Sequence, residues 1–152
     1  MTRKDPQRPA ASRIFSLQSR FTQKNLYGNL EYSWDSSSDQ GFRPANTAFW
    51  LESGATVKKL TARANIIRSG ADFHGYYENL DYESAELSYA GAERWGLRAS
   101  YLHQKRHSAI EPYFQPFYDR TVQAGAFYQA FRHLSLSLDE RVHDRRDLSV
   151  EQ

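Results

Sequence analysis

The stretch Leu26-Tyr27-Gly28-Asn29-Leu30-Glu31-Tyr32-Ser33-Trp34 decides the fold of this chain. Every second residue from Leu26 to Trp34 is apolar or glycine, whereas Tyr27, Asn29, Glu31 and Ser33 stand between them. Successive side chains of a β-strand point to opposite faces, so a period of two predicts a strand with one apolar and one polar face.

The same alternation recurs in seven further segments, and none of the residues on the eight apolar faces is charged, although 25% of the chain is charged. The seven segments are residues 15–21, 49–57, 60–66, 85–89, 95–101, 122–130 and 134–138. All five prolines fall outside the segments, as ladder hydrogen bonding requires. We predict strands centred near residues 17, 30, 52, 63, 86, 98, 126 and 137. A helix over residues 84–94 is the competing interpretation, but Ala90-Gly91-Ala92 stands where a turn is expected.

The connections between these segments alternate between short and long. The short ones lie near residues 22–25, 58–59, 90–94 and 131–133, and the long polar ones cover residues 35–46, 68–80 and 103–119. This pattern predicts an all-β fold, an antiparallel up-and-down meander of about eight strands. No helical segment is available to cover a flat sheet, so we expect the meander to be closed, or to be part of a larger β-barrel.

Length and composition exclude several protein classes. A chain of 152 residues predicts one domain, and 14% aromatic residues are too many for a disordered chain. A net charge of +2 without a basic stripe argues against a nucleic-acid partner. The absence of cysteine excludes disulfides and cysteine-based metal sites, and no apolar run is long enough for a transmembrane helix.

The two ends of the sequence differ from its middle. Residues 1–12 are basic and contain two prolines, and no apolar stretch of a secretory signal follows them. Residues 143–152 are charged and have no aromatic ending. We therefore expect a disordered or linker tail over residues 1–12, the β-barrel or barrel segment over residues 13–142, and a charged tail over residues 143–152.

Aromatic residues and charges indicate which face points outward. Aromatic side chains on the apolar face lie near strand ends, which predicts the girdles of a membrane β-barrel. They are Tyr32, Trp34, Phe49, Tyr101 and Tyr128 toward or near one rim, and Tyr89 and Trp95 at the short-turn rim. The opposite face carries charges of both signs, which can line a polar lumen: Glu31, Glu52, Arg63, Glu86 and Arg98. The apolar face also contains many small residues and would make a thin core if it turned inward, so we favour contact with lipid.

With these features the chain resembles bacterial outer-membrane β-barrels over roughly residues 13–142, as a pattern and not through a sequence motif. The resemblance implies a lipid bilayer as partner, the bacterial outer membrane as location, no cofactor, and a non-enzymatic role as a channel, an export conduit or a surface structural component. Such barrels usually end in an aromatic residue and begin with a long connection, whereas this chain ends Val150-Glu151-Gln152 and its first connection is short. We therefore expect a piece of a larger barrel completed by further strands or subunits, or a sequence truncated at Met1. A freestanding eight-stranded barrel is the other possibility.

Two other hypotheses come from different classes. The first is a soluble, cytoplasmic up-and-down β-barrel that turns its apolar face inward and binds an apolar ligand there. The second and weaker one is a membrane-barrel lipid hydrolase, because His133 and Ser135 resemble the His-x-Ser of outer-membrane phospholipases. Both residues fall on the polar face, however, and no orienting Asn or Asp is identifiable.

The sequence contains two candidate metal sites, and neither fits a known metal-binding motif. His103 and His107 have a spacing that binds metal on a helix, but here it runs from a strand into a loop. Asp35 and Asp39 lack the carbonyl and glutamate spacing of a calcium loop. We predict no catalytic residue and no metal site.

Overall fold

The computed structural model describes residues 13–36, 44–77, 79–91, 94–106 and 116–148. These residues form eight β-strands and one short 3-10 helix, η1 (Pro44–Asn46). The strands are β1 (Ile14–Gln23), β2 (Leu26–Asp35), β3 (Thr47–Val57), β4 (Leu60–Ser69), β5 (Leu80–Ala90), β6 (Trp95–Arg106), β7 (Phe117–Phe131) and β8 (Leu134–Asp147). No helix within the described ranges is long and apolar enough to cross a membrane.

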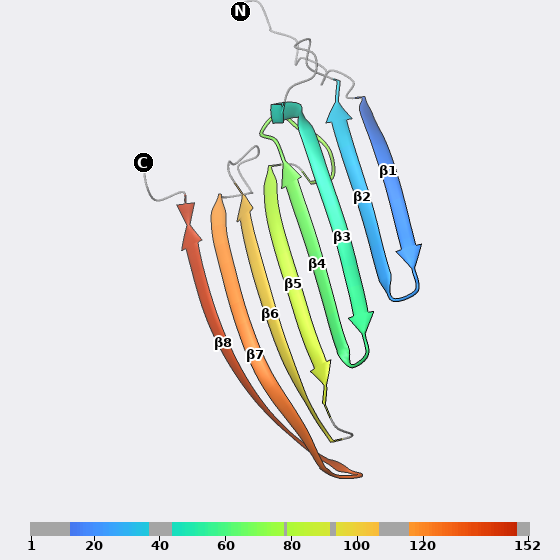
Figure 1. Cartoon of the computed structure of the whole chain (residues 1–152). Coiled ribbons are helices and arrows are strands. Elements are labelled where there is room, and N and C mark those ends of the chain that lie inside the picture. Colours follow the sequence, from blue (N-terminus) through green and yellow to red (C-terminus); the bar gives the residue numbers. More distant parts are fainter. Residues whose placement is uncertain (1–12, 37–43, 78, 92–93, 107–115, 149–152) are drawn as a thin grey trace, which may run out of the picture.

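All eight strands belong to one sheet, in which each strand pairs with the next one along the chain (Figure 1). Every pair is antiparallel. The predicted antiparallel up-and-down meander is therefore confirmed, and the competing helix over residues 84–94 is wrong, because β5 continues as a strand to Ala90. Hydrogen bonds do not close the sheet: β1 and β8 are its two edges.

The strands extend further toward the long connections than the alternation predicted. β8 continues to Asp147, so residues 143–147 are part of the sheet and the prediction of a charged tail from residue 143 is wrong there. Side chains of β7 contact this end of β8: His143 Nε2 lies 3.1 Å from the carboxylate of Asp119, and the guanidinium of Arg145 lies over the ring of Phe117. Such polar and cation–aromatic contacts between strands stabilise a strand pair that has few aliphatic side chains. The tail predicted over residues 1–12 lies outside the described residues.

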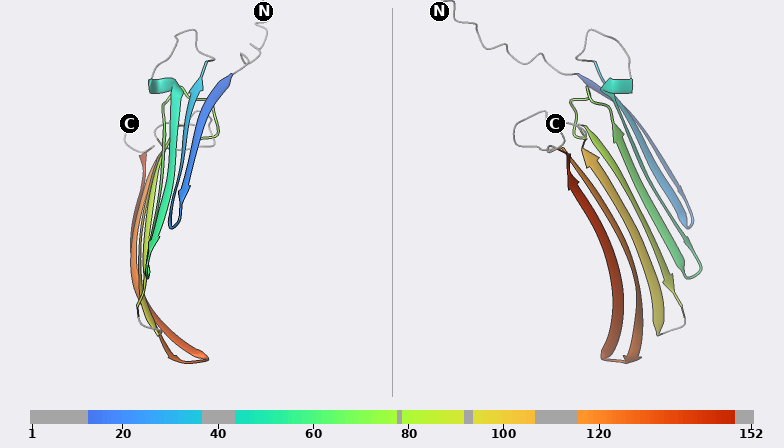
Figure 2. Two further views of the ribbon diagram at one scale, coloured as in Figure 1. Left: turned by 45° about the vertical axis from the view of Figure 1, so that its right-hand side comes forward. Right: turned by 90° about the vertical axis from the view of Figure 1, so that its left-hand side faces the viewer.

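The hairpin turns have an unusual backbone. Lys24-Asn25 and Lys58-Lys59 are two-residue connections, and the first residue of each has a positive φ, 47° at Lys24 and 54° at Lys58. Successive hairpins are displaced along the strand direction, so their turns descend stepwise from β1–β2 to β7–β8 (Figure 1). Figure 2 shows that the sheet is twisted and bowed, as antiparallel sheets generally are.

Few hydrophobic side chains are buried. Among the described residues they are Ala48, Ile67 and Phe73, which lie near the long connections. Many large hydrophobic side chains are instead exposed to solvent, such as Leu17 (71%) and Leu138 (78%). A soluble domain of about this length buries roughly two thirds of the surface of its unfolded chain, mainly in a single core. The isolated sheet has no such core.

Candidate functional site

The register places the eight apolar segments on one side of the sheet, which we call the uncharged face. Directly opposite residues of paired strands point to the same side. Leu30 stands opposite Leu51, which stands opposite Ile66, and the same holds across β6, β7 and β8 for Leu97, Ala126 and Leu138. Within the described strands, Glu140 of β8, between Leu138 and Val142, is the one charged side chain that interrupts the uncharged stretches. Eight separately recognised patterns thus form one continuous surface.

Aromatic side chains lie at both ends of the uncharged face. Near the long connections, the rings of Phe15 and Trp34 stack with centroids 5.7 Å apart. At the short-turn end, Trp95 lies 5.5 Å from Tyr89, centroid to centroid, and directly opposite Tyr128. The placement of Tyr128 near the other rim is therefore wrong, because β7 begins at Phe117 beside the long connection and reaches its short turn at Phe131, three residues after Tyr128.

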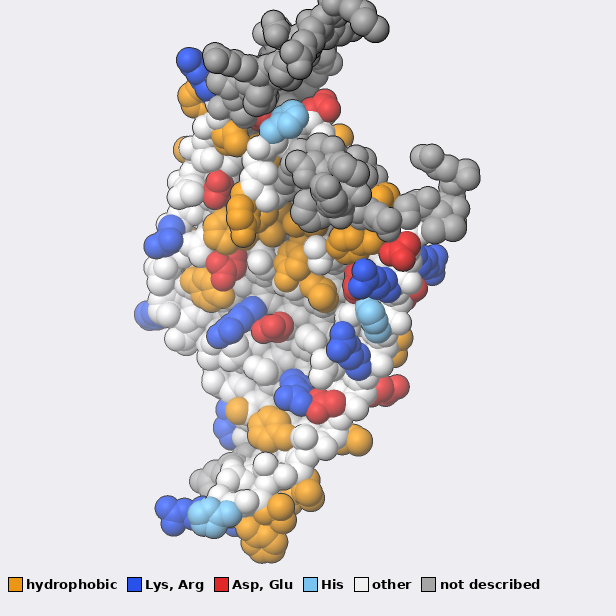
Figure 3. All heavy atoms as spheres, turned by 180° about the vertical axis from the view of Figure 1, so that it is seen from behind, with side chains coloured by type: hydrophobic (Ala, Val, Ile, Leu, Met, Phe, Trp, Pro, Cys, Tyr) orange, Lys and Arg blue, Asp and Glu red, His pale blue; other side chains and the backbone are white. Residues whose placement is uncertain are grey.

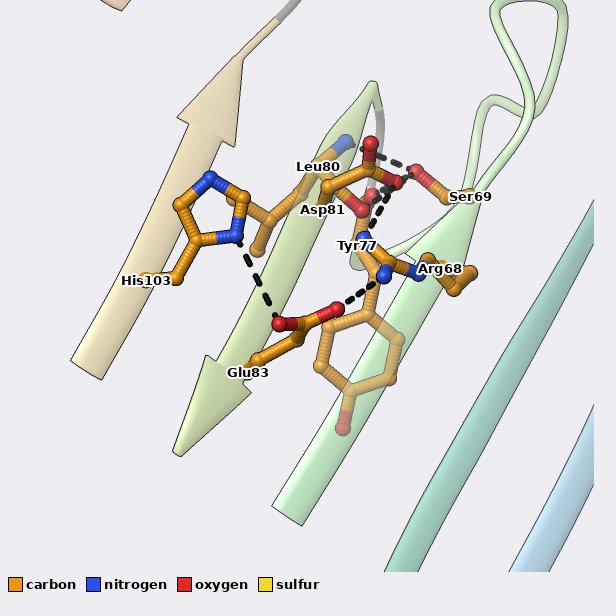
Figure 4. A network of polar contacts seen from close by, with 7 residues as sticks. All are labelled: Arg68, Ser69, Tyr77, Leu80, Asp81, Glu83 and His103. Carbon is orange, nitrogen blue, oxygen red and sulfur yellow. Dashed lines mark hydrogen bonds and ion pairs between the residues drawn. The ribbon is translucent and has the colours of Figure 1, made fainter. Parts of the chain in front are cut away.

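Paired charges limit the uncharged face on the side of the long connections. Arg68 stands opposite both Phe49 and Asp81 and therefore lies on the same side of the sheet as the apolar residues. Its guanidinium lies 3.5 Å from Asp81 and contacts Glu83, whose other oxygen lies 3.7 Å from His103 Nδ1 (Figure 4). The face thus changes from apolar, through aromatic, to charged along the strand direction.

The other side of the sheet is the charged face, and it carries all five of the predicted lumen charges: Glu31, Glu52, Arg63, Glu86 and Arg98. Figure 3 looks onto this face and shows Lys, Arg, Asp and Glu side chains across its middle. Arg63 of β4 stands directly opposite Glu86 of β5. Glu52 accepts a hydrogen bond from Asn29 Nδ2 at 3.1 Å, and Asn29 Oδ1 in turn accepts one from Arg20 Nε at 3.1 Å.

The clearest ion pair on this face crosses an entire strand. Arg98 of β6 donates two hydrogen bonds, of 2.8 and 2.5 Å, to the carboxylate of Asp139 on β8. Gly125 of β7 stands between them in the register, and a Cβ there would collide with the Asp139 carboxylate. Asp139 lies just beyond the alternating segment, which ends at Leu138, and was therefore not among the predicted charges, although the parity of β8 places residue 139 on this side.

Gly54 and Gly96, like Gly125, each lie under a side chain of a neighbouring strand. A Cβ on Gly54 would meet the ring of Tyr27, and a Cβ on Gly96 would lie 2.5 Å from the ring of Phe127. Each glycine thus lets a side chain of the neighbouring strand lie flat over it. An open groove of about 560 Å³ lies over the middle of the charged face and is lined mainly by polar side chains: Thr61, Arg63, Glu86, Ser88, Arg98, Ser100 and Gln123.

The connection between β4 and β5 folds onto the charged face. His74 donates two hydrogen bonds to Asp35 Oδ2, from its backbone nitrogen at 3.1 Å and from Nδ1 at 2.9 Å, and the Asp35 side chain is fully buried. Phe73 is also buried, close to Gly75. Burial, followed by the charges of Glu31 and Tyr76, raises the pKa of Tyr77. The residues at this end of the charged face are thus covered by the protein's own loop.

The remaining sequence candidates are not brought together. His133 lies in the turn between β7 and β8, whereas Ser135 lies on β8 opposite Gln129. His107 and Asp39 lie outside the described residues. Among the residues that the structure describes, no group of three His, Asp or Glu side chains could hold a metal ion.

Comparisons with known proteins complete the description of the site. Protein-family models, curated proteins and solved structures were each searched, and none of them matches this chain.

Proposed function

We propose that this chain is a non-enzymatic membrane β-barrel protein of the bacterial outer-membrane kind, or a segment of one, and that it forms the wall of a channel. In this proposal the uncharged face contacts lipid and the charged face lines the aqueous lumen. The observation that carries the proposal is the register, because it combines eight uncharged segments into one exposed surface opposite a surface that contains the charges.

The dimensions of the uncharged face support contact with a bilayer. Its stretches on the longer strands, such as residues 26–34 and 49–57, cover nine residues each. At a rise of about 3.4 Å per residue and a tilt of about 40°, such a stretch spans roughly 23 Å, close to the apolar band of an outer-membrane barrel. Aromatic side chains at both ends of the face fit the two interfaces of the membrane.

The position of the loop that contains His74 supports the assignment of the charged face to the lumen. The loop packs on the charged face and hydrogen bonds to Asp35 there. In a small barrel, loops that fold inward lie over the lumen, and the groove along Arg63, Glu86 and Arg98 would then be a polar lining. The soluble barrel requires the opposite arrangement, with Leu51 and Leu97 inside.

The two edges of the sheet fit a barrel as well. β1 and β8 run antiparallel to each other, because eight strands alternate in direction. They can therefore pair with each other or with further antiparallel strands, and either arrangement removes the exposed edges of the sheet.

The test is conductance in planar phosphatidylcholine bilayers after refolding in detergent. Arg63→Glu combined with Arg98→Glu should shift the reversal potential under a salt gradient toward cation preference, since two positive charges in the lumen become negative. The control, Lys105→Glu with Arg120→Glu, makes the same change of charge on the other side of the sheet and should leave the reversal potential unchanged. A stable monomer that stays soluble without detergent would contradict the proposal. A protein that inserts but does not conduct would contradict the channel role, and the charges would then be a closed network within a narrow barrel.

A further inference from the structure

The short-turn rim of the sheet carries an unbalanced positive charge. The four short connections, residues 24–25, 58–59, 91–94 and 132–133, contain five basic residues and one acidic residue, Glu93, which lies outside the described residues. The five basic residues are Lys24, Lys58, Lys59, Arg94 and Arg132. The three long connections between the observed strands, residues 36–46, 70–79 and 107–116, show the opposite sign, with Arg43 as their single Lys or Arg residue against Asp39, Asp72, Glu78 and Glu111.

The basic side chains of this rim are exposed, and most form no ion pair within the part of the chain that the structure describes. Lys24, Lys58, Arg94 and Arg132 are all exposed, and none of them forms an ion pair with another described residue. Lys59 differs, because its Nζ donates a hydrogen bond of 2.7 Å to the carbonyl oxygen of Gly91. Four cationic groups are thus available to a partner at one end of the sheet.

Lys24 and Lys58 occupy backbone positions that a lysine seldom adopts. The first residue of a two-residue hairpin turn with positive φ is normally glycine or asparagine, which adopt this conformation with little strain. Here Lys24 and Lys58 occupy it, with φ of 47° and 54°. Backbone positions of this kind are enriched at functional sites, which favours a function for the two lysine side chains.

The surroundings of the rim indicate which partner fits. On β5, β6 and β7 the uncharged face begins, next to this rim, with the aromatic cluster of Tyr89, Trp95 and Tyr128. Aromatic side chains beside apolar ones fit the interface of a membrane, and a series of cations along the same rim fits anionic phosphate groups. We propose that the short-turn rim binds the headgroups of anionic phospholipids. This inference rests on the proposed membrane location and adds a preference for one class of lipid.

The experiment measures how tightly the refolded full chain binds to vesicles of phosphatidylcholine alone and of phosphatidylcholine with roughly one third phosphatidylglycerol. The variant combines Lys24→Asn with Lys58→Asn, since asparagine suits a positive φ and the fold should be retained. The control combines Arg13→Gln with Lys105→Gln, which removes the same charge near the long connections. Each surface cation contributes enough that two of them should account for a preference of about tenfold to thirtyfold for the anionic vesicles.

The inference is supported if the wild-type chain and the control prefer anionic vesicles, the variant loses most of that preference, and high salt removes it in all three. Equal binding of the wild-type chain to both kinds of vesicle would overturn the inference and leave the proposed function standing. An equal loss in the variant and in the control would also overturn it, because net charge and not the rim would then be responsible. Failure to bind either vesicle would contradict the membrane proposal itself. Far-UV circular dichroism of each variant shows whether the strands are retained.

Discussion

The two faces of the sheet differ in what lies over their glycine residues. On the uncharged face, Gly28 has open space above it, and the nearest atom to an added Cβ is a backbone oxygen 3.9 Å away. On the charged face, Gly54, Gly96 and Gly125 each lie beneath a side chain of a neighbouring strand. The charged face therefore packs against itself at these three glycines, whereas no side chain of the described residues covers Gly28 on the uncharged face.

The largest expected effect comes from placing a charge on the uncharged face. Leu97 lies near the middle of the uncharged stretch of β6, and Leu97→Arg should destabilise the inserted state by about 2–4 kcal/mol, because arginine is costly inside a bilayer. Refolding yield in phosphatidylcholine vesicles measures this. Ser100→Arg is the control, since Ser100 lies on the same strand but on the charged face. Equal yields for the two variants would contradict the assignment of the faces.

A smaller effect should follow from adding a methyl group to a covered glycine. In Gly96→Ala the new Cβ would lie 2.7 Å from the carbonyl oxygen of Tyr89 and 2.5 Å from the ring of Phe127. We expect a loss of about 1–3 kcal/mol in the free energy of unfolding, because the backbone has to shift. Gly28→Ala should change this free energy by less than about 0.5 kcal/mol. Denaturant titration in detergent, followed by tryptophan fluorescence, compares them; a greater loss at Gly28 would mean that the uncharged face is packed against protein.

The smallest expected effect is local to the loop on the charged face. Asp35→Asn removes the charge that accepts both hydrogen bonds from His74, but it keeps one acceptor oxygen. The loop should then open more often, by about 1 kcal/mol or roughly fivefold in amide exchange of residues 70–77. Hydrogen exchange detected by mass spectrometry measures this. Asp139→Asn, which changes a carboxylate elsewhere on the same face, should leave the exchange of this loop unchanged; acceleration in both variants would show that the loop responds to general loosening of the sheet.

The alternation of residues was sufficient to predict the strands and their faces. In an antiparallel pair the parity of a position decides its side, so a segment such as residues 95–101 assigns Leu97 to one face and Arg98 to the other before any pairing is known. The five predicted lumen charges lie on one face for this reason. Whether that face lines a lumen stays a prediction.

What the alternation could not predict depends on register and on non-local contacts. The level of Tyr128 depends on where β7 ends, and the pairing of Arg98 with Asp139 depends on two registers and a glycine between them. The contact between His74 and Asp35 joins residues that are 39 positions apart, and nothing in a period of two describes it. Alternation also does not predict whether the sheet closes, because closure depends on the number of strands and their stagger.

The strict succession of neighbours in the sheet has a consequence for how the chain acquires its structure. Because every strand pairs only with the strands that precede and follow it in sequence, no pairing in the described sheet has to wait for a distant segment to arrive. Hairpins with two-residue turns form on a timescale of about microseconds, and topologies rich in local contacts fold fast. We therefore expect the sheet to grow by successive addition of hairpins, with β1–β2, β3–β4 and β7–β8 as natural starting units because each has a two-residue turn. The same succession means that one hairpin more or less would leave the remaining pairings as they are.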